Sequence, residues 1–250
     1  MPDLPYQKIV CLVPSLTELL FDLGLEGQVI GRTRFCIHPE NKVKEVEIVG
    51  GTKNPRLEKI IEMQPDIIIA NKEENRKEDI EILRKYSKVH VTEIDTIQDA
   101  LLTIANLGQL LGVEHKAQNL VEKIDYLLSK KPEAPELFVS YFIWKDPWMT
   151  IGKDTYIHDV LDAYNLKNVF RNLIRYPKTT LEELSSLNPD VILLSSEPYP
   201  FKEKHEAEIR EVCPASKIEL VNGEWFSWYG SRMIEAFTAL NSWRKSLTKS

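Results

Sequence analysis

The chain has 250 residues, of which 43% are hydrophobic and 28% are charged, and its formal net charge is −6. This length allows one large domain or two of modest size, and the composition is ordinary for a globular protein with a buried core. The mildly acidic balance, without a cluster of Lys and Arg, argues against a nucleic-acid partner. The sequence also lacks a run of about 18 apolar residues, so it predicts no membrane-spanning helix.

In the first part of the chain, short β-rich runs alternate with helical patterns. We expect strands at 8–13, 29–35, 67–70 and 89–94, and helices at 14–24, 55–63 and 76–87. The first helix carries a capping-box pattern, with Ser15 as the N-cap and Glu18 three residues later, and it ends at Gly24. Such alternation predicts a mostly parallel sheet covered on both faces.

The alternation breaks near residue 96. Apolar residues then recur at helical spacing to about residue 130, and neither Gly108 nor Gly112 interrupts the period, which predicts one continuous helix up to about 50 Å long. Beyond it we expect strands at 137–143, 191–195 and 217–221, and helices at 156–164, 181–187, 203–212 and from about 230. The expected domains are an N-terminal α/β lobe over 1–95, a linking backbone helix over 96–131 and a C-terminal α/β lobe over 132–250.

An internal repeat relates the two expected lobes. Residues 57–69 align with residues 181–193 at a constant offset of 124, with Leu-Glu near the start and Pro-Asp before the strand in both copies. Each copy predicts a helix, a Pro-Asp turn and a buried strand, in which Pro stops the helix and Asp bonds the backbone of its own turn. Two equivalent lobes leave a cleft at their junction, and such clefts are preferred ligand sites.

The same offset pairs Glu73 with Glu197, because each follows the inner strand of its lobe. Two acids at equivalent places on two lobes could grip basic groups of a large partner. The alternative is that both are solvated loop residues.

Aromatic residues form a second group of candidates. Trp144 and Trp148 follow an expected strand, the run 225–229 is Trp-Phe-Ser-Trp-Tyr, and Phe35 ends a strand in the first lobe. Aromatic rims bind large flat ligands, because stacking uses area and costs little rotamer entropy. The alternative is core packing, although five consecutive residues cannot all face inward.

Signals of catalysis are weak. The sequence contains no GxGxxG, GxSxG or P-loop motif, its histidines are scattered, and its three cysteines have no metal-ligand spacing. We therefore expect no enzyme activity, no catalytic residue, no protein-bound metal and no catalytic cofactor.

Several motifs together resemble the helical-backbone periplasmic binding proteins that serve ABC importers, and most closely their cobalamin-binding members. The motifs are Val-Pro-Ser-Leu-Thr-Glu-Leu-Leu at 13–20 followed by Gly24, the segment 29–39 ending in His-Pro, the segment 57–70, Gly-Lys-Asp-Thr at 152–155 with Val160 and Leu161, and Trp-Phe at 225–226. Together they cover nearly the whole chain.

The resemblance implies two parallel-sheet Rossmann-like lobes joined by a single long backbone helix, with cobalamin or another metal chelate carried in the interlobe cleft. Ligand contacts are then expected from Phe35, Trp144, Trp148, Glu224, Trp225, Phe226 and Trp228. Glu73 or its neighbour Glu74, together with Glu197, is expected to dock on arginines of the ABC permease, whose ATPase completes the importer. We expect the binding protein to be a monomer.

The resemblance leaves alternatives open. The ligand could be a ferric siderophore or haem, or the chain could be a cytosolic corrinoid-handling protein. The family implies a periplasmic or cell-surface location, whereas the N-terminal residues show no basic region followed by an apolar one, the pattern of a secretory leader. A cytoplasmic location therefore stays open.

Overall fold

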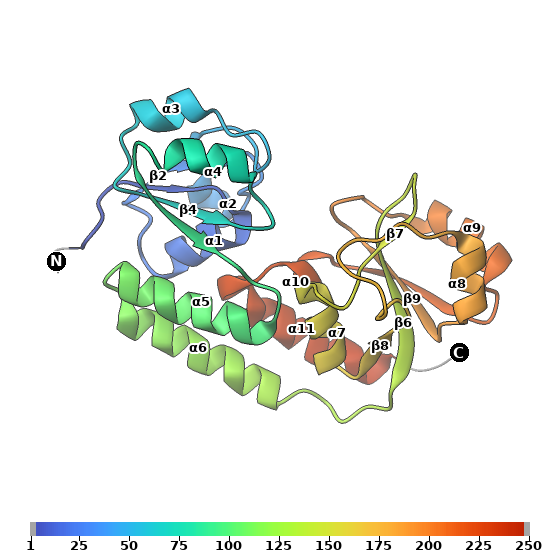
Figure 1. Ribbon diagram of the computed structural model, residues 1–250. Helices are drawn as coiled ribbons and strands as arrows, with labels where there is room; N and C mark the ends of the chain where they lie inside the picture. Colours follow the sequence, from blue (N-terminus) through green and yellow to red (C-terminus); the bar gives the residue numbers. More distant parts are fainter. Residues whose placement is uncertain (1–3, 248–250) are drawn as a thin grey trace. The chain divides into compact units, whose positions relative to one another are not determined.

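The computed structural model describes residues 4–247, which form two compact α/β units (Figure 1). Unit 1 consists of the chain up to Ile94, Gln98–Asp125 and Tyr229–Arg232. Unit 2 consists of Asp95–Ile97, Tyr126–Trp228 and the chain from Met233.

Unit 1 is built on a parallel sheet with the strand order β3-β2-β1-β4-β5. Its strands are β1 (Ile9–Cys11), β2 (Val29–Arg32), β3 (Glu47–Ile48), β4 (Ile67–Asn71) and β5 (Lys88–Thr92). The central strands β1 and β4 are buried on both faces, which explains why their sequences are continuous apolar runs rather than alternating ones.

The helices that surround this sheet are α1 (Pro14–Asp22), α2 (Glu40–Val43), α3 (Leu57–Glu62) and α4 (Lys77–Leu83). The capping box expected for the first of them is wrong. Val13 is the N-cap of α1, Ser15 lies inside the first turn, and the Glu18 carboxylate pairs with Arg232 instead of reaching back to the backbone. Pro14 begins the helix because its missing N–H would have no partner there in any case.

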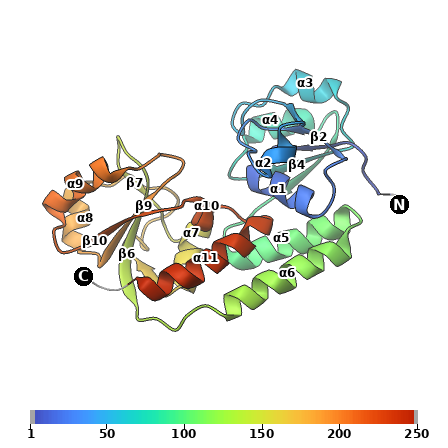
Figure 2. The same cartoon turned by 180° about the vertical axis from the view of Figure 1, so that it is seen from behind.

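The single long backbone helix expected over 96–131 is also wrong. The segment forms two helices, α5 (Ile97–Leu110) and α6 (Glu114–Ser129), which lie side by side (Figures 1 and 2). Gly112 adopts a positive φ of 74°, a conformation that glycine enters readily, and it ends α5. Gly108 permits the close approach, because a Cβ there would come within 2.3 Å of Ala117 Cβ.

Unit 2 contains the second sheet, with the order β10-β9-β6-β7 and with β8 paired to β6. Its strands are β6 (Leu137–Trp144), β7 (Met149–Thr150), β8 (Leu166–Asn168), β9 (Val191–Ser195) and β10 (Lys217–Val221). Strands β8, β9 and β10 join β6 in a parallel arrangement, whereas the short β7 runs antiparallel to β6. The sheet is therefore parallel apart from one edge hairpin.

The remaining helices follow in chain order. They are α7 (Tyr156–Ala163), α8 (Leu181–Leu187), α9 (Glu203–Val212), α10 (Glu224–Ser227), the 3-10 turn η1 (Gly230–Arg232) and α11 (Met233–Ser246). Of these, η1 belongs to unit 1, where it packs on α1. A short segment far along the chain thus completes the first unit.

The repeat has a structural role that is the same in both units. Asp66 Oδ2 accepts hydrogen bonds from the backbone N–H groups of Gln7, at 2.7 Å, and Lys8, at 2.9 Å, where β1 begins. Asp190 Oδ2 accepts from the N–H of Phe138, at 2.8 Å, near the start of β6. Each Pro-Asp turn therefore ties the strand that follows it to the neighbouring central strand, which is a longer-range role than the local turn bond expected from the sequence.

Candidate functional site

The carboxyl-end edge of each sheet is where a ligand is expected, because ligands of open α/β sheets gather outside the carboxyl ends of the strands. In unit 1 the chain moves outward from β1 through β2 to β3 and then returns to the other side of β1 with β4. The loops that follow β1 and β4 therefore flank the point where the strand order reverses.

Asn75 joins three loops at this edge. Its buried side-chain amide donates to the carbonyl oxygens of Leu12, at 3.3 Å, and Thr52, at 3.0 Å. Its carbonyl Oδ1 accepts from the N–H of Asn71 at 2.8 Å. The loops after β1, β3 and β4 are thereby held together by one side chain.

A short polar residue at the end of β4 shapes the turn that carries two candidate docking acids. Asn71 Oδ1 accepts from the N–H groups of Glu73, at 2.8 Å, and Glu74, at 3.2 Å. Glu74 Oε1 then accepts from the Tyr229 hydroxyl at 3.0 Å, whereas Glu73 Oε1 is buried and has no hydrogen-bond partner among the described residues.

The equivalent turn in unit 2 is built in a similar way. Ser195, at the repeat offset from Asn71, accepts from the Glu197 N–H at 3.3 Å and donates to the Glu197 carbonyl at 2.5 Å. Glu197 Oε1 accepts from the Ser227 hydroxyl, at 2.9 Å, and from the Trp228 indole N–H, at 2.8 Å. Glu197 is therefore a half-buried, hydrogen-bonded acid rather than a solvated loop residue.

Two of the aromatic candidates are exposed at these edges. Phe35, in the loop after β2, is 48% exposed, and the Arg34 guanidinium lies 5.0 Å from its ring centre. Trp144, the last residue of β6, is 40% exposed and makes an edge-to-face contact with Tyr199 at 5.5 Å between ring centres. Glu224 and Trp225 are partly buried in α10.

Three other aromatic candidates, Trp148, Phe226 and Trp228, lie in the packed interior of unit 2 rather than at an exposed edge. Trp148 is 8% exposed and stacks on Phe201 within the core of unit 2. Phe226 is 1% exposed and packs on Tyr141 and Trp243. Trp228 is buried with its indole N–H on Glu197. Aromatic spacing alone does not distinguish a core position from a rim position.

One loop that the sequence pattern did not indicate presents apolar side chains. Ile174 is 62% exposed and Leu173 is 37% exposed. The loop is fixed by hydrogen bonds from Gly152 N–H to the Arg175 carbonyl, at 2.7 Å, and from Lys153 N–H to the Leu173 carbonyl, at 3.0 Å. A Cβ at Gly152 would come within 2.6 Å of the Ile174 backbone, so this position requires glycine. The glycine of the Gly-Lys-Asp motif is therefore the sequence feature that could have indicated this loop.

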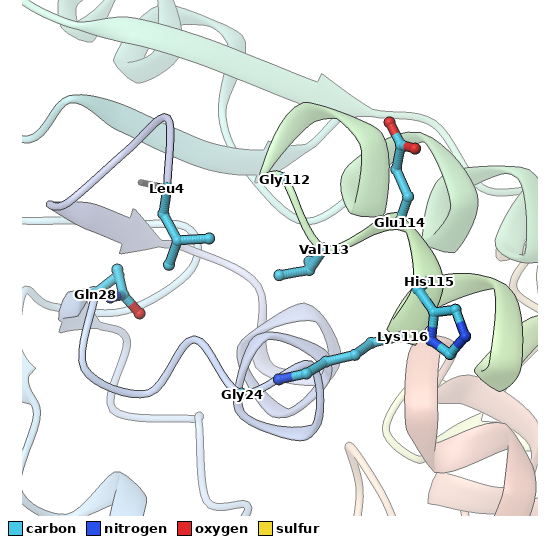
Figure 3. Close-up of a pocket in the computed structure, with 8 residues that line it drawn as sticks. All are labelled: Leu4, Gly24, Gln28, Gly112, Val113, Glu114, His115 and Lys116. Carbon is cyan, nitrogen blue, oxygen red and sulfur yellow. The ribbon is translucent and has the colours of Figure 1, made fainter. Parts of the chain in front are cut away.

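A pocket of about 790 Å³ lies in unit 1 but at the opposite, amino-end edge of its sheet (Figure 3). Gln28 directly precedes β2, and Lys116 Nζ donates to the Leu23 carbonyl at 2.8 Å, where α1 ends. The residues that line it are Leu4, Gly24, Gln28, Gly112, Val113, Glu114, His115 and Lys116. None of the sequence-derived candidates lies in this pocket.

Two buried thiols in unit 1 are not reactive groups. Burial raises the pKa of Cys11 to about 12, and burial also raises the pKa of Cys36, whose Sγ lies 3.2 Å from the hydroxyls of Thr17 and Thr33. Both therefore remain protonated at neutral pH and pack as small hydrophobic groups. Across residues 4–247, the structure shows no group of three His, Cys, Asp or Glu side chains arranged to hold a metal ion.

His205 is a buried neutral imidazole in the aromatic cluster of unit 2. Its Nδ1 accepts from the Lys202 N–H at 2.9 Å at the start of α9, and its Nε2 lies 3.3 Å from the Tyr199 hydroxyl. Burial, reinforced by the charges of Lys204 and Lys145, lowers the pKa of His205 below its ordinary value.

This lowered pKa predicts an acid-sensitive unit 2. As the pH falls through about 6.5, the unfolded chain binds a proton at His205 that the folded chain does not, so stability decreases from neutral pH downward until the folded imidazole is protonated as well. His205→Asn keeps an acceptor for the Lys202 N–H without titrating, and we expect it to lose less stability over this range. All tryptophans lie in unit 2, so urea unfolding followed by tryptophan fluorescence reports on it.

The exposed His115→Asn variant is the matched control and should follow the parent protein. If His205→Asn shows the same pH dependence as the parent protein, His205 is not the source of the sensitivity.

Comparison with known protein families gives an independent view of this fold. Residues 9–212 match the model of the periplasmic binding protein family. The chain belongs to this family. Its members bind solutes for transport, so this chain is a substrate-binding protein of the ABC-importer type and is not an enzyme. No helix in the described part of the chain is long and apolar enough to cross a membrane.

Two curated relatives show the range of the similarity. The uncharacterized ABC transporter substrate-binding lipoprotein YvrC of Bacillus subtilis is 30% identical over 203 residues, which are 75% of this chain and 63% of YvrC. A vitamin B12-binding protein of Vibrio campbellii is 25% identical over 94% of this chain and 88% of its own length. This chain therefore spans less than two thirds of YvrC but most of the Vibrio protein.

Solved structures confirm the two-lobed α/β fold of this periplasmic binding protein. The periplasmic vitamin B12 binding protein BtuF of Vibrio cholerae has a TM-score of 0.83 at 19% identity, over 97% of this chain and 98% of BtuF. The periplasmic heme-binding protein RhuT of Roseiflexus sp. RS-1 has a TM-score of 0.84 at 17% identity, over 96% of this chain and 98% of RhuT. At these identities the similarity establishes the fold alone.

Proposed function

We propose that this chain captures a corrinoid of the cobalamin class outside the cytoplasm or at the cell surface and delivers it to the permease and ATPase of an ABC importer. A vitamin B12-binding relative aligned over 94% of the chain supports the choice of ligand. The lipoprotein relative supports the location.

The observation that carries the proposal is that partly or largely exposed aromatic rings stand at the carboxyl-end edges of both sheets. Phe35 lies at the edge of unit 1, and Trp144 and Trp225 lie at the edge of unit 2. A corrin is a large flat macrocycle, and aromatic faces and edges supply contact area to such a ligand at little cost in rotamer entropy. The exposed Leu173 and Ile174 add apolar surface to unit 2.

Glu73, Glu74 and Glu197 supply the docking acids in this proposal. They stand on turns that Asn71 and Ser195 organise after β4 and β9, so each acid has a fixed backbone position. Carboxylates held in this way suit guanidinium groups of a permease, because Arg binds carboxylates with two parallel hydrogen bonds.

Titration with cyanocobalamin, followed by visible absorbance, tests the ligand. We expect saturable binding with a Kd well below about 50 μM. Absence of binding at that concentration contradicts the corrinoid proposal. Parallel titrations with haemin and with a ferric hydroxamate siderophore show which other member of the metal-chelate class binds in that case.

The exposed aromatic rings provide a prediction on the same assay. Phe35→Ala and Trp225→Ala should each weaken cyanocobalamin binding about tenfold, the factor that corresponds to loss of about 1.4 kcal/mol of aromatic contact. Tyr126→Ala is the control, because Tyr126 is an exposed aromatic residue on α6 outside the candidate site. If all three variants bind cyanocobalamin with the affinity of the parent protein, Phe35 and Trp225 do not contact the ligand.

A further inference from the structure

Two of the proposed docking acids lie within hydrogen-bond distance of three consecutive side chains of one segment, of which the Ser227 hydroxyl can donate instead to the Gly223 carbonyl, also at 2.9 Å. Glu197 Oε1 accepts from the Ser227 hydroxyl, at 2.9 Å, and from the Trp228 indole N–H, at 2.8 Å. Glu74 Oε1 accepts from the Tyr229 hydroxyl at 3.0 Å. The carboxylates that are proposed to meet a permease are thus already bonded to the protein's own side chains.

The held segment is one where the chain passes between the two units. Trp228 and Glu197 belong to unit 2, and Tyr229 and Glu74 belong to unit 1, so each side of the 228–229 peptide is anchored by an acid of its own unit. The held segment begins at Ser227, the last residue of α10, and this helix contains the candidate ligand contacts Glu224 and Trp225. The two acids therefore set the position of the C-terminal end of α10 and of the two residues after it.

The anchoring on the side of unit 2 depends on close packing. A Cβ at Gly223 would come within 2.4 Å of Ser195 Oγ and 2.5 Å of Glu197 Cγ, so only glycine lets the start of α10 approach the Glu197 turn. Ser195 is itself fixed by a hydrogen bond from the Tyr141 hydroxyl at 3.1 Å. The position of the Glu197 side chain is therefore determined by the packing of Gly223 and Ser195 against it.

We propose that Glu197 and Glu74 are positioning residues for the segment Ser227–Tyr229, and through it for the ligand contacts of α10, in addition to serving as docking acids. This inference rests on the proposed docking function. Positioning needs an acceptor oxygen, whereas docking on a guanidinium needs a negative charge. A cationic partner group that takes over these carboxylates competes with Ser227, Trp228 and Tyr229, which links docking to the position of α10.

Hydrogen exchange followed by mass spectrometry tests the positioning role without any ligand. The amides of Phe226, Ser227 and Trp228 are bonded to the carbonyls of Gly223 and Glu224, so they report on the order of α10. We expect the double variant Glu197→Ala with Glu74→Ala to speed exchange in peptides over 224–229 about tenfold or more, as loss of several hydrogen bonds to charged acceptors implies. Peptides over β9 and α9 are the internal reference for global stability.

Two further variants make the result specific. Glu73→Ala removes a neighbouring acid whose side chain makes no hydrogen bond to the segment, and it should leave exchange over 224–229 unchanged. The double variant Glu197→Gln with Glu74→Gln keeps the acceptor oxygens without the charges, and its exchange should stay close to that of the parent protein. Parent-like exchange in the double alanine variant overturns the proposal, and so does equal acceleration in the alanine and glutamine variants.

The rate of cyanocobalamin dissociation then connects the segment to the ligand. The double alanine variant should release cyanocobalamin about tenfold faster than the parent protein, while the double glutamine variant should release it at the parent rate. If cyanocobalamin does not bind the parent protein, the proposed ligand fails but the exchange result still decides the positioning role. Unchanged dissociation in an alanine variant with accelerated exchange overturns the link to α10.

Discussion

Arg232→Met is expected to lower the free energy of unfolding of unit 1 by about 3–5 kcal/mol at neutral pH, the range for removing one partner of a buried ion pair. Arg232 Nε donates to Glu18 Oε2 at 3.0 Å, and Nη2 donates to Oε1 at 2.6 Å. Both side chains are almost fully buried. The variant leaves the Glu18 carboxylate buried without its cation.

The loss should depend on pH. Burial raises the pKa of Glu18 above its ordinary value, and the charge of Arg232 opposes that rise. In Arg232→Met burial acts without the opposing charge and hydrogen bonds of Arg232, so the folded pKa of Glu18 rises further. Between the unfolded pKa of about 4.3 and this higher value the folded state binds more protons than the unfolded state, and stability falls as pH rises. The variant should therefore be closest to the parent protein near pH 4–5 and furthest from it above the raised pKa.

Amide exchange in peptides over β1 and β4 measures this loss, because all tryptophans lie outside unit 1. Lys44→Met is the control for charge removal: its pair with Glu40 is exposed, so the cost should be below about 1 kcal/mol. Adding Glu18→Gln to Arg232→Met should recover part of the stability. A loss that is independent of pH and not recovered by Glu18→Gln would mean that the packing of Arg232, rather than its charge, matters.

Asn75→Asp is expected to destabilise unit 1 by about 3 kcal/mol, because it places a charged acceptor against other acceptors in a buried site. The side-chain amide of Asn75 donates to the carbonyls of Leu12 and Thr52, and an aspartate can donate to neither. The change is nearly isosteric, so packing is preserved and hydrogen bonding is what differs. Amide exchange over β1 and β4 again provides the measurement.

Asn41→Asp is the matched control, since it makes the same chemical change at an exposed position in α2. It should alter the stability of unit 1 by less than about 0.5 kcal/mol. If the two variants are equally stable, the three loops at the carboxyl-end edge are held together by something other than Asn75.

These two expected effects come from residues that lie far from their partners in sequence. Arg232 reaches Glu18 because residues 229–232 fold onto α1. Gly230 in that segment adopts a φ of 83°, and a Cβ added to it would come within 3.3 Å of Leu19 Cβ. No local pattern near Glu18 indicates such a partner. The sequence instead offered a local one, the capping box with Ser15, and local and distant partners compete for the same carboxylate.

The repeat was the most informative feature of the sequence. It covers α8 (181–187) and the start of β9 (191–195), and its offset placed the two acid-bearing turns at equivalent positions after β4 and β9. The reason is that a buried parallel strand and its Pro-Asp turn are specified within a dozen residues, by apolar runs and by a side chain that bonds the adjacent strand.

The α/β class, the two related sheets, most of their strands and the family of the chain were therefore predictable from the residues alone. Three features required the folded chain. The segment after residue 96 turns back at Gly112. Among the aromatic residues, Trp148, Phe226 and Trp228 are interior, whereas Phe35 and Trp144 are exposed. Finally, Glu197 and Glu74 accept hydrogen bonds from residues of one segment. The physical reason is range: strand and turn signals act between near neighbours, whereas burial and the partner of a charged group depend on what the rest of the chain brings to that place.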